Sequence, residues 1–377
     1  MTVAGLIFSN KQEQGFPEMT RRRTTASIPF GCRYRLIDFP LSNMVNSEIT
    51  TIGVVTHYNY QSLMDHIGAG KDWDLARRSG GIKILPPYVT AYENHAAGKL
   101  YESRLEALMG SANFINRCGA DYIVLSDCDV IMNIDLSAVI GEHIRNEAYI
   151  TLVAKKVNTK DTLFGYNADV IDMDENGRVT SIFRNAPTKG NYYAHTNLMV
   201  VSRTDLQNIV SDSIAHRYTS FVNDILIRQL KKKNIRAYIH NGFCASVTSL
   251  ESYFNVSMKM LEDAVRADLF GNRNRQIFTK IRNSAPTKYD AEAKIGNSMI
   301  ADGCIIEGEV ENSIIFRGVH VGRGSVVKNC ILLQDTYVGA NVHLNCVVAD
   351  KNVIIKEGRT LSGHETMPFF IDKGATV

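Results

Sequence analysis

The first two-thirds of the chain alternates short runs of aliphatic residues with segments of helical periodicity. Four runs of mostly apolar residues predict strands that are buried on both faces: residues 3–8, 51–56, 122–125 and 150–154. Residues 101–117 lie between two of these runs, repeat apolar side chains at intervals of three or four, and predict a helix. Strands that alternate with helices in this way predict an α/β domain with a largely parallel sheet.

The pattern changes near residue 295, where aliphatic residues begin to recur at intervals of six with small or polar residues between them. Val321 precedes Val327 by six residues and Val338 precedes Leu344 by six, while Val321 and Val338 lie 17 apart, close to one triangular coil of three hexapeptides. Ile354 follows Val338 by 16. Several repeats agree, so we favour a parallel β-helix with inward aliphatic residues over an antiparallel β-domain with coincidental spacing. About four coils would form a short solenoid, which usually stacks or oligomerises to protect its ends and edges.

The two patterns predict two domains joined by a connector, which suits a chain of 377 residues. We expect an α/β domain over residues 1–254, a connector over residues 255–290 and a hexapeptide-repeat domain over residues 291–377. The connector contains one helical stretch, around residues 258–269, followed by a polar run.

Composition narrows the protein class further. Hydrophobic residues make up 45% of the chain, charged residues 21%, and the formal net charge is +3, so there is no electrostatic case for nucleic acid or a membrane surface. The N-terminus has no basic region before its apolar run, and no run of about 18 apolar residues occurs. Seven cysteines without CxxC spacing argue against a disulfide framework or a zinc site, and we expect a reducing cytoplasm.

Three segments carry a specific resemblance to a known family. Residues 29–43 read PFGCRYRLIDFPLSN, residues 67–75 read IGAGKDWDL, and residues 80–88 read GGIKILPPY. These resemble the PFGGxYRxIDFxLSN, IGxGxxWDL and GGVxxLPPY segments of bacterial glucose-1-phosphate adenylyltransferase. The resemblance implies a nucleotidyltransferase-like α/β domain (Rossmann-like, GT-A-like) followed by a left-handed parallel β-helix.

The family joins ATP and glucose 1-phosphate into ADP-glucose and pyrophosphate, and its chemistry uses carboxylates to hold magnesium. In the resemblance Asp129 takes the place of the first metal carboxylate, and it is the only catalytic or metal position that we find retained. Asp129 could bind residual Mg²⁺, or it could cap the turn after its strand. The second metal carboxylate aligns with residues 246–249, which read Ser-Val-Thr-Ser and contain no carboxylate.

Other active-site segments of the family are also replaced. Residues 9–20 align with the glycine-rich phosphate loop of the family, and residues 25–26 align with a Lys-Pro pair. Residues 103–107, 184–187 and 195–197 align with Gly-Thr-Ala-Asp-Ala, Glu-Glu-Lys-Pro and Ser-Met-Gly, respectively. All five segments of this chain lack the functional side chains of the family. A retained framework with a replaced active site resembles the GlgD-type subunit of Gram-positive bacteria. That resemblance implies a regulatory, catalytically degenerate subunit in glycogen biosynthesis, which needs no cofactor itself and forms a heterotetramer with a catalytic partner that uses Mg²⁺ and nucleotide.

Arginines gather in and just before the segment of residues 29–43 and are candidates for binding a phosphorylated effector: Arg21, Arg22, Arg23, Arg33 and Arg35. Guanidinium groups suit this task because they bind phosphate oxygens in pairs. The alternative is a solvated, salt-bridged surface, with Arg35 held by Asp38 as part of the fold.

Three other functions remain open at this point. The chain could be an active adenylyltransferase that uses Lys11 or the arginines at 21–23 in place of the lost groups. It could be an acyltransferase with His320 or His343 of the coils as general base. It could also be a module that binds a sugar nucleotide without turning it over.

Overall fold

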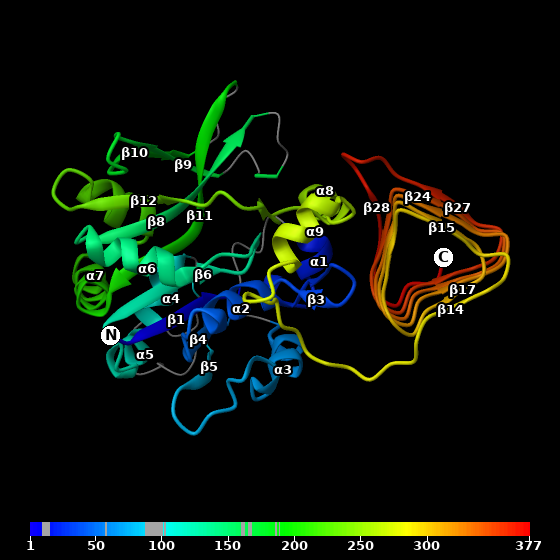
Figure 1. Cartoon of the computed structure of the whole chain (residues 1–377), viewed down its shortest axis with the longest axis horizontal. Helices are drawn as coiled ribbons and strands as arrows, with labels where there is room; N and C mark the ends of the chain where they lie inside the picture. The colour runs from blue at the N-terminus through cyan, green and yellow to red at the C-terminus, as the bar shows by residue number, and fades with distance from the viewer. Residues whose placement is uncertain are drawn as a thin grey trace.

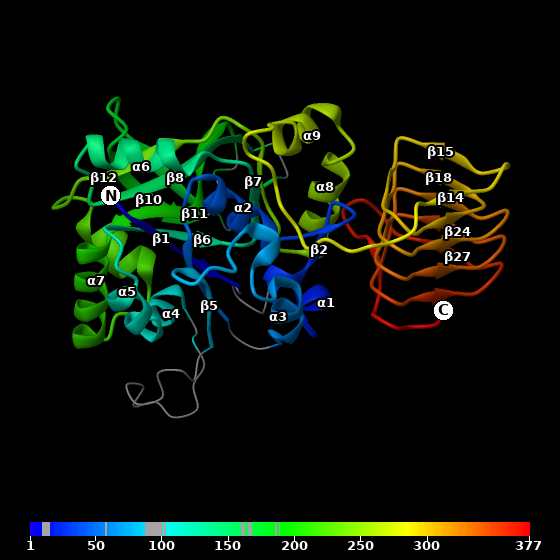
Figure 2. The ribbon, with the colours of Figure 1, turned by 60° about the horizontal axis from the view of Figure 1, so that its bottom comes forward.

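The computed structural model describes residues 1–9, 16–56, 59–86, 101, 103–159, 163–164, 168–184, 187 and 189–377. Within these residues an α/β domain is followed by a triangular β-helix, as Figure 1 shows down the axis of the coils and Figure 2 from the side. The two-part fold predicted from the sequence, an α/β nucleotidyltransferase-type domain and a left-handed parallel β-helix, is confirmed.

A nine-stranded mixed sheet forms the centre of the α/β domain, and its main path runs in the order β10-β9-β11-β6-β1-β4-β5. The strands β6, β1, β4 and β5 are parallel, β11 joins β6 antiparallel, and β12 and β8 extend the sheet beside β11. All four strands predicted from apolar runs are present. The strand bounds are β1 Val3–Phe8, β4 Thr51–Val55, β5 Gly81–Leu85, β6 Tyr122–Asp127, β8 Ile150–Asn158, β9 Asp169–Met173, β10 Val179–Arg184, β11 Asn191–Ser202 and β12 Ile235–Ile239.

Helices cover both faces of this sheet, because successive residues of a buried strand point to opposite sides. On β1, Ile7 belongs to one apolar cluster and Leu6 to the other. The first cluster packs under α2 Asp38–Asn46, α3 Gln61–Ile67 and α6 Leu136–Arg145; the second packs under α4 Arg104–Gly110, α5 Ala112–Arg117, α7 Arg203–His216 and the π-helical turn η3 Phe221–Ile227.

The helix predicted over residues 101–117 is two helices in the structure, with Ser111 between α4 and α5. The hydroxyl of Ser111 donates a hydrogen bond to the carbonyl oxygen of Ala107 at 2.8 Å. Gly110, a weak helix former, comes just before it. A weak helix former followed by a serine that bonds back to the chain accounts for the break.

The second domain is built from three parallel five-stranded sheets, each contributing one strand to every coil. The strand bounds are, for the first sheet, β14 Lys288–Tyr289, β17 Ile305–Ile306, β20 His320–Val321, β23 Tyr337–Val338 and β26 Ile354–Ile355; for the second, β15 Lys294–Gly296, β18 Glu309–Glu311, β21 Val326–Lys328, β24 His343–Asn345 and β27 Thr360–Ser362; and for the third, β16 Met299–Ile300, β19 Ile314–Ile315, β22 Ile331–Leu332, β25 Val347–Ala349 and β28 Phe369–Ile371.

The predicted inward residues Val321, Val338 and Leu344 are at most 2% exposed. The prediction for Ile354 is wrong: Ile355 pairs with Val338 and is fully buried, whereas Ile354 points outward. The spacing from Val338 to Ile355 is 17 residues, the same as from Val321 to Val338. Two consecutive isoleucines make the choice ambiguous in the sequence, and the coil length decides it.

The two domains are joined by α8 Leu250–Lys259, α9 Asp263–Phe270 and an extended segment over residues 271–287. The boundary predicted after residue 254 falls inside α8, and β14 begins before the boundary predicted at residue 291. A third apolar cluster includes Tyr253 of α8, Phe30 near the N-terminus, and Ile314 and Ile331 of the third β-helix sheet. One side of the β-helix is therefore packed against the α/β domain, as Figure 1 shows.

None of the described helices combines the length and the apolar content that a membrane crossing requires. All seven cysteines lie in the described part of the chain and are free thiols.

Candidate functional site

The parallel strands β1 and β6 end side by side, with Phe8 paired to Asp127. Ligands of open α/β sheets bind at this edge, beyond the carboxyl ends of the strands. Asp127 and Asp129 lie here and are 3% and 2% exposed. Arg104, at the start of α4, forms an ion pair with the carboxylate of Asp127, and its guanidinium carbon lies 5.4 Å from the ring centre of Phe8. At this edge of the sheet, the negative charge of Asp127 is therefore already neutralised by Arg104.

A short antiparallel ladder fixes what lies beside Asp129. Strand β7 Val130–Met132 pairs with β13 Cys244–Ser246, so that Ser246 lies opposite Val130. The backbone N–H of Val247 donates to the carbonyl oxygen of Asp129 at 2.7 Å. Residues 246–249, which the resemblance aligned with the second metal carboxylate, thus lie against Asp129 and bring no carboxylate to it.

Magnesium, the ion that the resemblance implies, makes definite demands on its ligands. Mg²⁺ needs near-octahedral oxygen ligation, usually with one or two carboxylates and substrate phosphates. Asp127 is paired with Arg104, and the described ranges contain no group of three or more His, Cys, Asp or Glu side chains arranged to hold a metal. The described residues therefore do not fit the two-carboxylate magnesium site that the resemblance implies. Lys11 and the rest of the phosphate-loop segment at 10–15 lie outside the described residues, as do residues 185–186.

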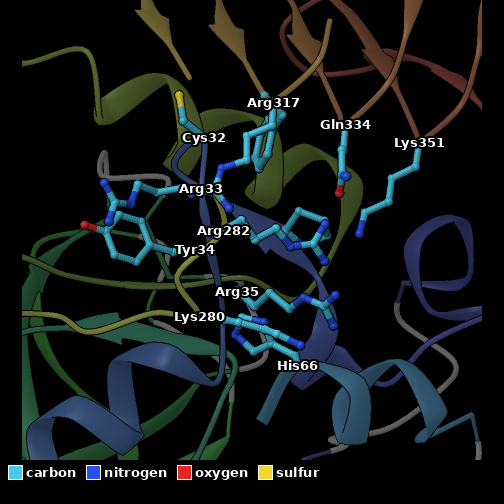
Figure 3. A pocket seen from close by; sticks show the side chains of 12 residues that line it. Cys32, Arg33, Tyr34, Arg35, His66, Lys280, Arg282, Arg317, Gln334 and Lys351 are labelled. Atoms are coloured by element: carbon cyan, nitrogen blue, oxygen red, sulfur yellow. The ribbon is translucent and has the colours of Figure 1, made fainter. Parts of the chain in front are cut away.

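A second candidate site is a strongly basic pocket between the two domains, shown in Figure 3. The α/β domain lines one side of the pocket with its β2–β3 hairpin (β2 Pro29–Phe30, β3 Tyr34–Arg35) and α3. The connector contributes Lys280 and Arg282, and the β-helix forms the opposite side. The lining residues are Pro29, Cys32, Arg33, Tyr34, Arg35, His66, Lys280, Arg282, Phe316, Arg317, Gln334 and Lys351. Among these described residues six are Lys or Arg and none is Asp or Glu, so the pocket is suited to an anion.

The β-helix presents three of these side chains from equivalent corners of successive coils. Arg317, Gln334 and Lys351 are spaced 17 residues apart, one coil length. Backbone bonds tie the corners together: Asp335 N–H donates to Arg317 O and Asn352 N–H to Gln334 O, each at 3.0 Å. In Figure 3 the three side chains extend from the coils into the pocket, on the side opposite Arg35 and Lys280. This column was not predicted from the sequence, although the 17-residue repeat is a signal that could have revealed it.

Crowded positive charge alters the basic groups of the pocket. Burial, followed by the charges of Arg35 and Arg23, lowers the pKa of Lys351 to about 7, although Asp350 opposes the shift. Burial also lowers the pKa of Arg35 to about 10. A bound anion would relieve both effects, because it would supply the negative charge that favours the protonated forms.

Asp38 and Ser62 hold the α/β side of the pocket in place. Asp38 accepts a bond from the backbone N–H of Arg35 at 2.9 Å and lies 2.6 Å from Nε2 of His66. The guanidinium of Arg35 donates to the carbonyl oxygen of Ser62 at 2.5 Å. Asp38 thus fixes the backbone of Arg35, while the guanidinium is directed by Ser62 into the pocket lining.

The five arginines singled out from the sequence fall into two groups. Arg33 and Arg35 line the pocket. Arg21, Arg22 and Arg23 follow the short helix α1 Pro17–Thr20 and contact the C-terminal end of the β-helix: Arg23 forms a buried ion pair with Asp350 at 2.5 Å, Arg21 lies 3.8 Å from Asp372, and Arg22 donates to the carbonyl oxygen of Lys373 at 3.5 Å.

The two histidines considered for acyl transfer lie on different sheets of the β-helix. His320, on β20, stacks on Tyr337 with ring centres 4.9 Å apart, and its Nε2 lies 3.5 Å from Glu307. His343 lies exposed on β24 of the neighbouring sheet. The structure does not bring the two together.

Comparison with known families and proteins agrees with this architecture. The family model described as Nucleotidyl transferase matches residues 16–263, and that described as GlmU-like, C-terminal hexapeptide matches residues 284–366.

Similar proteins cover nearly the whole chain. Glycogen biosynthesis protein GlgD of Bacillus subtilis (strain 168) is 30% identical over 374 residues, which cover 99% of this chain and 96% of that protein. Glucose-1-phosphate adenylyltransferase of Desulfitobacterium hafniense (strain Y51) is 31% identical over 342 residues, 90% of this chain and 84% of that protein. The enzyme of the same name from Geobacillus stearothermophilus is 29% identical over 327 residues, covering 86% and 82%. With both domains and its full length matched, the chain belongs to the glucose-1-phosphate adenylyltransferase family of nucleotidyl transferases, within which it is similar to GlgD.

Proposed function

We propose that this chain is a regulatory, catalytically degenerate subunit of glucose-1-phosphate adenylyltransferase, which acts in glycogen biosynthesis in the cytoplasm by modulating a catalytic partner. The similarity to a glycogen biosynthesis protein and to several adenylyltransferases supports the pathway. One observation carries the catalytic part of the proposal. The residues that lie against Asp129 across the β7–β13 ladder bring no second carboxylate.

The incomplete metal site matters because the reaction concentrates negative charge. A sugar phosphate and a triphosphate must approach each other, and divalent cations normally neutralise and align them. With Asp127 paired to Arg104, Asp129 has little carboxylate support for a cation. The guanidinium of Arg104 also lies over Phe8, at the end of the first strand. Any Mg²⁺ in the assembly would then be bound with nucleotide in the catalytic partner.

The basic pocket supports the regulatory part of the proposal. Its cations come from the β2–β3 hairpin, the connector and the coils of the β-helix. A phosphorylated metabolite bound there would contact both domains at once and would stabilise one relative arrangement of them. We propose Arg33 and Arg35, together with Lys351, as its principal ligands. Through a heterotetramer, that arrangement would be communicated to the catalytic partner.

The proposal is tested by assaying ADP-glucose formation with this chain alone, the catalytic subunit from the same organism alone, and the two together. We expect no measurable turnover by the chain alone and a change of several-fold in the activity of the partner on mixing. Turnover by the chain alone at a rate close to that of the catalytic subunit would refute the proposal and favour an autonomous adenylyltransferase.

A pocket variant separates the effector site from assembly. The double substitution Arg35→Gln and Lys351→Gln should leave co-purification with the partner intact and abolish the response of the mixture to phosphorylated sugars. Arg359→Gln is the matched control, because Arg359 lies exposed on the β-helix outside the pocket. Equal responses of the two variants would show that the pocket does not bind the effector.

A further inference from the structure

Lys351 places a primary amine inside the basic pocket between the two domains. Its side chain extends into the pocket from the last corner of the column that Arg317 and Gln334 begin (Figure 3). Arg35 lies on the opposite, α/β side of the pocket, and Arg282 of the connector also lines it. None of the described lining residues carries a carboxylate. The amine therefore has positive neighbours and no counter-charge in the pocket lining.

The carboxylate of the adjacent residue, Asp350, is already engaged. Its Oδ2 forms the buried ion pair with Arg23 at 2.5 Å, and its Oδ1 accepts a hydrogen bond from the backbone N–H of Lys351 at 2.7 Å. The part of the chain that the structure describes offers the Lys351 side chain no ion pair or hydrogen bond.

The charged groups that act on this amine come from several elements around it: Arg35 of β3, Arg23 after α1, Asp350 of its own coil and Arg282 of the connector. Burial, and then the surrounding guanidinium groups, lower the pKa of Lys351 to about 7. At neutral pH a large share of the amine is therefore unprotonated and nucleophilic.

Carbon dioxide reacts with such an amine without a leaving group or a change of oxidation state. The unprotonated nitrogen adds to the carbon of CO2 and forms a C–N bond, while one C=O electron pair moves onto oxygen. The nitrogen then releases one proton to solvent. The product is a carbamate, whose charge of −1 replaces the neutral amine. This reaction would supply the negative charge that the pocket lining lacks.

The pocket favours the carbamate for the same reason that it disfavours the ammonium form. Carbamate oxygens accept charge-assisted hydrogen bonds, and Arg35, Arg282 and Arg317 offer paired N–H donors in the same lining. The pocket has a volume of about 410 Å³, which leaves room for three added atoms. A solvent-exposed lysine has neither advantage, because it is protonated at neutral pH and its carbamate would be surrounded by water.

We propose that Lys351 is a carbamylation site, at which carbon dioxide binds covalently and fills the basic pocket with the carboxylate of the modified side chain. The modification would exclude other anions from the same cations. Competition with a phosphorylated effector rests on the proposed function. The covalent step requires neither effector nor catalytic partner, so it can fail while the proposed function stands.

Carbon-13 NMR of the full chain in 13C-labelled bicarbonate at pH 8 tests the covalent step. The native chain should give a carbamate signal distinct from those of bicarbonate and CO2. Alkylation with a trialkyloxonium salt, followed by peptide mass spectrometry, should place the trapped group on Lys351. At a fixed concentration of dissolved CO2, the ratio of carbamate to unmodified lysine should rise at least tenfold between pH 6.5 and 8.0, because the reaction consumes unprotonated amine and releases a proton.

Three variants locate the site. Lys351→Gln should abolish the signal, whereas Lys356→Gln, at an exposed position just after β26 and outside the pocket, should leave it unchanged. Arg282→Gln keeps the amine but removes one exposed cation of the pocket, so it should lower the ratio of carbamate to lysine at least threefold. Circular dichroism checks that the variants are folded.

Sulfate titrations with and without bicarbonate separate covalent modification from ordinary anion binding. Bicarbonate should weaken sulfate binding to the native chain, and a trapped carbamate should accompany the effect. Weaker sulfate binding without a trapped group would mean that bicarbonate only binds as an anion, and would overturn the proposal. The absence of any adduct, an adduct spread over exposed lysines, or a signal that persists in Lys351→Gln would do the same.

Discussion

At the residue scale, the anion-binding chemistry of the interdomain pocket depends on Lys351, a lysine that lies among arginines. Lys351 is partly buried, its neighbour Asp350 is paired with Arg23, and Arg35 and Arg282 add further positive charge. An ammonium group in this setting gives up its proton near neutral pH, because the charged form is poorly solvated and repelled. Its protonation state should therefore respond to an anion in the pocket.

We predict that sulfate binds this pocket more weakly as the pH rises through about 7, the pKa of Lys351. Below that pH Lys351 is protonated and attracts the anion, while above it binding must also take up a proton. Between pH 6.5 and 8.5 the affinity should fall by roughly tenfold. Sulfate is the appropriate probe because it does not titrate in this range, and calorimetry in buffers of different ionisation heat would report the proton uptake.

Two variants show whether Lys351 is the source of that dependence. Lys351→Gln should weaken sulfate binding and flatten its pH profile, whereas Lys294→Gln, at an exposed position on β15 outside the pocket, should do neither. Burial holds the pKa of His66 below its usual value, so this imidazole should stay neutral over most of the range. A steep profile that persists in Lys351→Gln would contradict this assignment.

At the scale of single elements, the coils depend on residues whose direction is set by register. Val338 lies between Val321 and Ile355 in the interior of the β-helix and is fully buried. Its neighbour Tyr337, one residue earlier, points to solvent. A slip of one residue would exchange the two faces, so the inward column fixes the alignment of successive coils.

We predict that Val338→Ala lowers the free energy of unfolding by about 2 kcal/mol, because it removes two buried carbons and leaves a cavity between neighbouring coils. His343→Ala, on the same coil but exposed, should change it by less than about 0.5 kcal/mol. Urea unfolding followed by circular dichroism measures both values. Equal effects of the two substitutions would mean that the interior column does not control the stability of the coil.

The whole molecule is held together by an interface with an apolar centre and a buried charge pair. The apolar part joins α8 and the N-terminal segment to the third sheet of the β-helix. The Arg23–Asp350 pair is also buried, with side chains 6% and 4% exposed, and it links the segment after α1 to the last coils. The α/β domain and the β-helix should therefore unfold together.

We predict a single calorimetric transition for the whole chain. Arg23→Ala should destabilise it by about 3–5 kcal/mol, because the carboxylate of Asp350 would stay buried without its counter-charge. Arg21→Ala is the control: its pair with Asp372 is 68% and 61% exposed, and its loss should lower the melting temperature little. Two separate transitions in the native chain would show that the domains are not coupled in this way.

Several features were determined by the sequence alone, because they depend on local patterns. Apolar runs located the strands β1, β4, β6 and β8, and intervals of six and 17 residues located the coils. The resemblance to the adenylyltransferase family rests on contiguous segments, and the comparisons confirm it.

Only the tertiary structure could decide which distant residues meet. It placed Val247 against Asp129, paired Arg104 with Asp127, and joined Arg35 and Lys280 to a column of β-helix corners. It also divided the arginines, sending Arg23 to a buried ion pair with Asp350. Periodicity reports which side of its own element a residue occupies, but not what lies opposite. That depends on how the domains pack, and packing is set by apolar surfaces contributed from the whole chain.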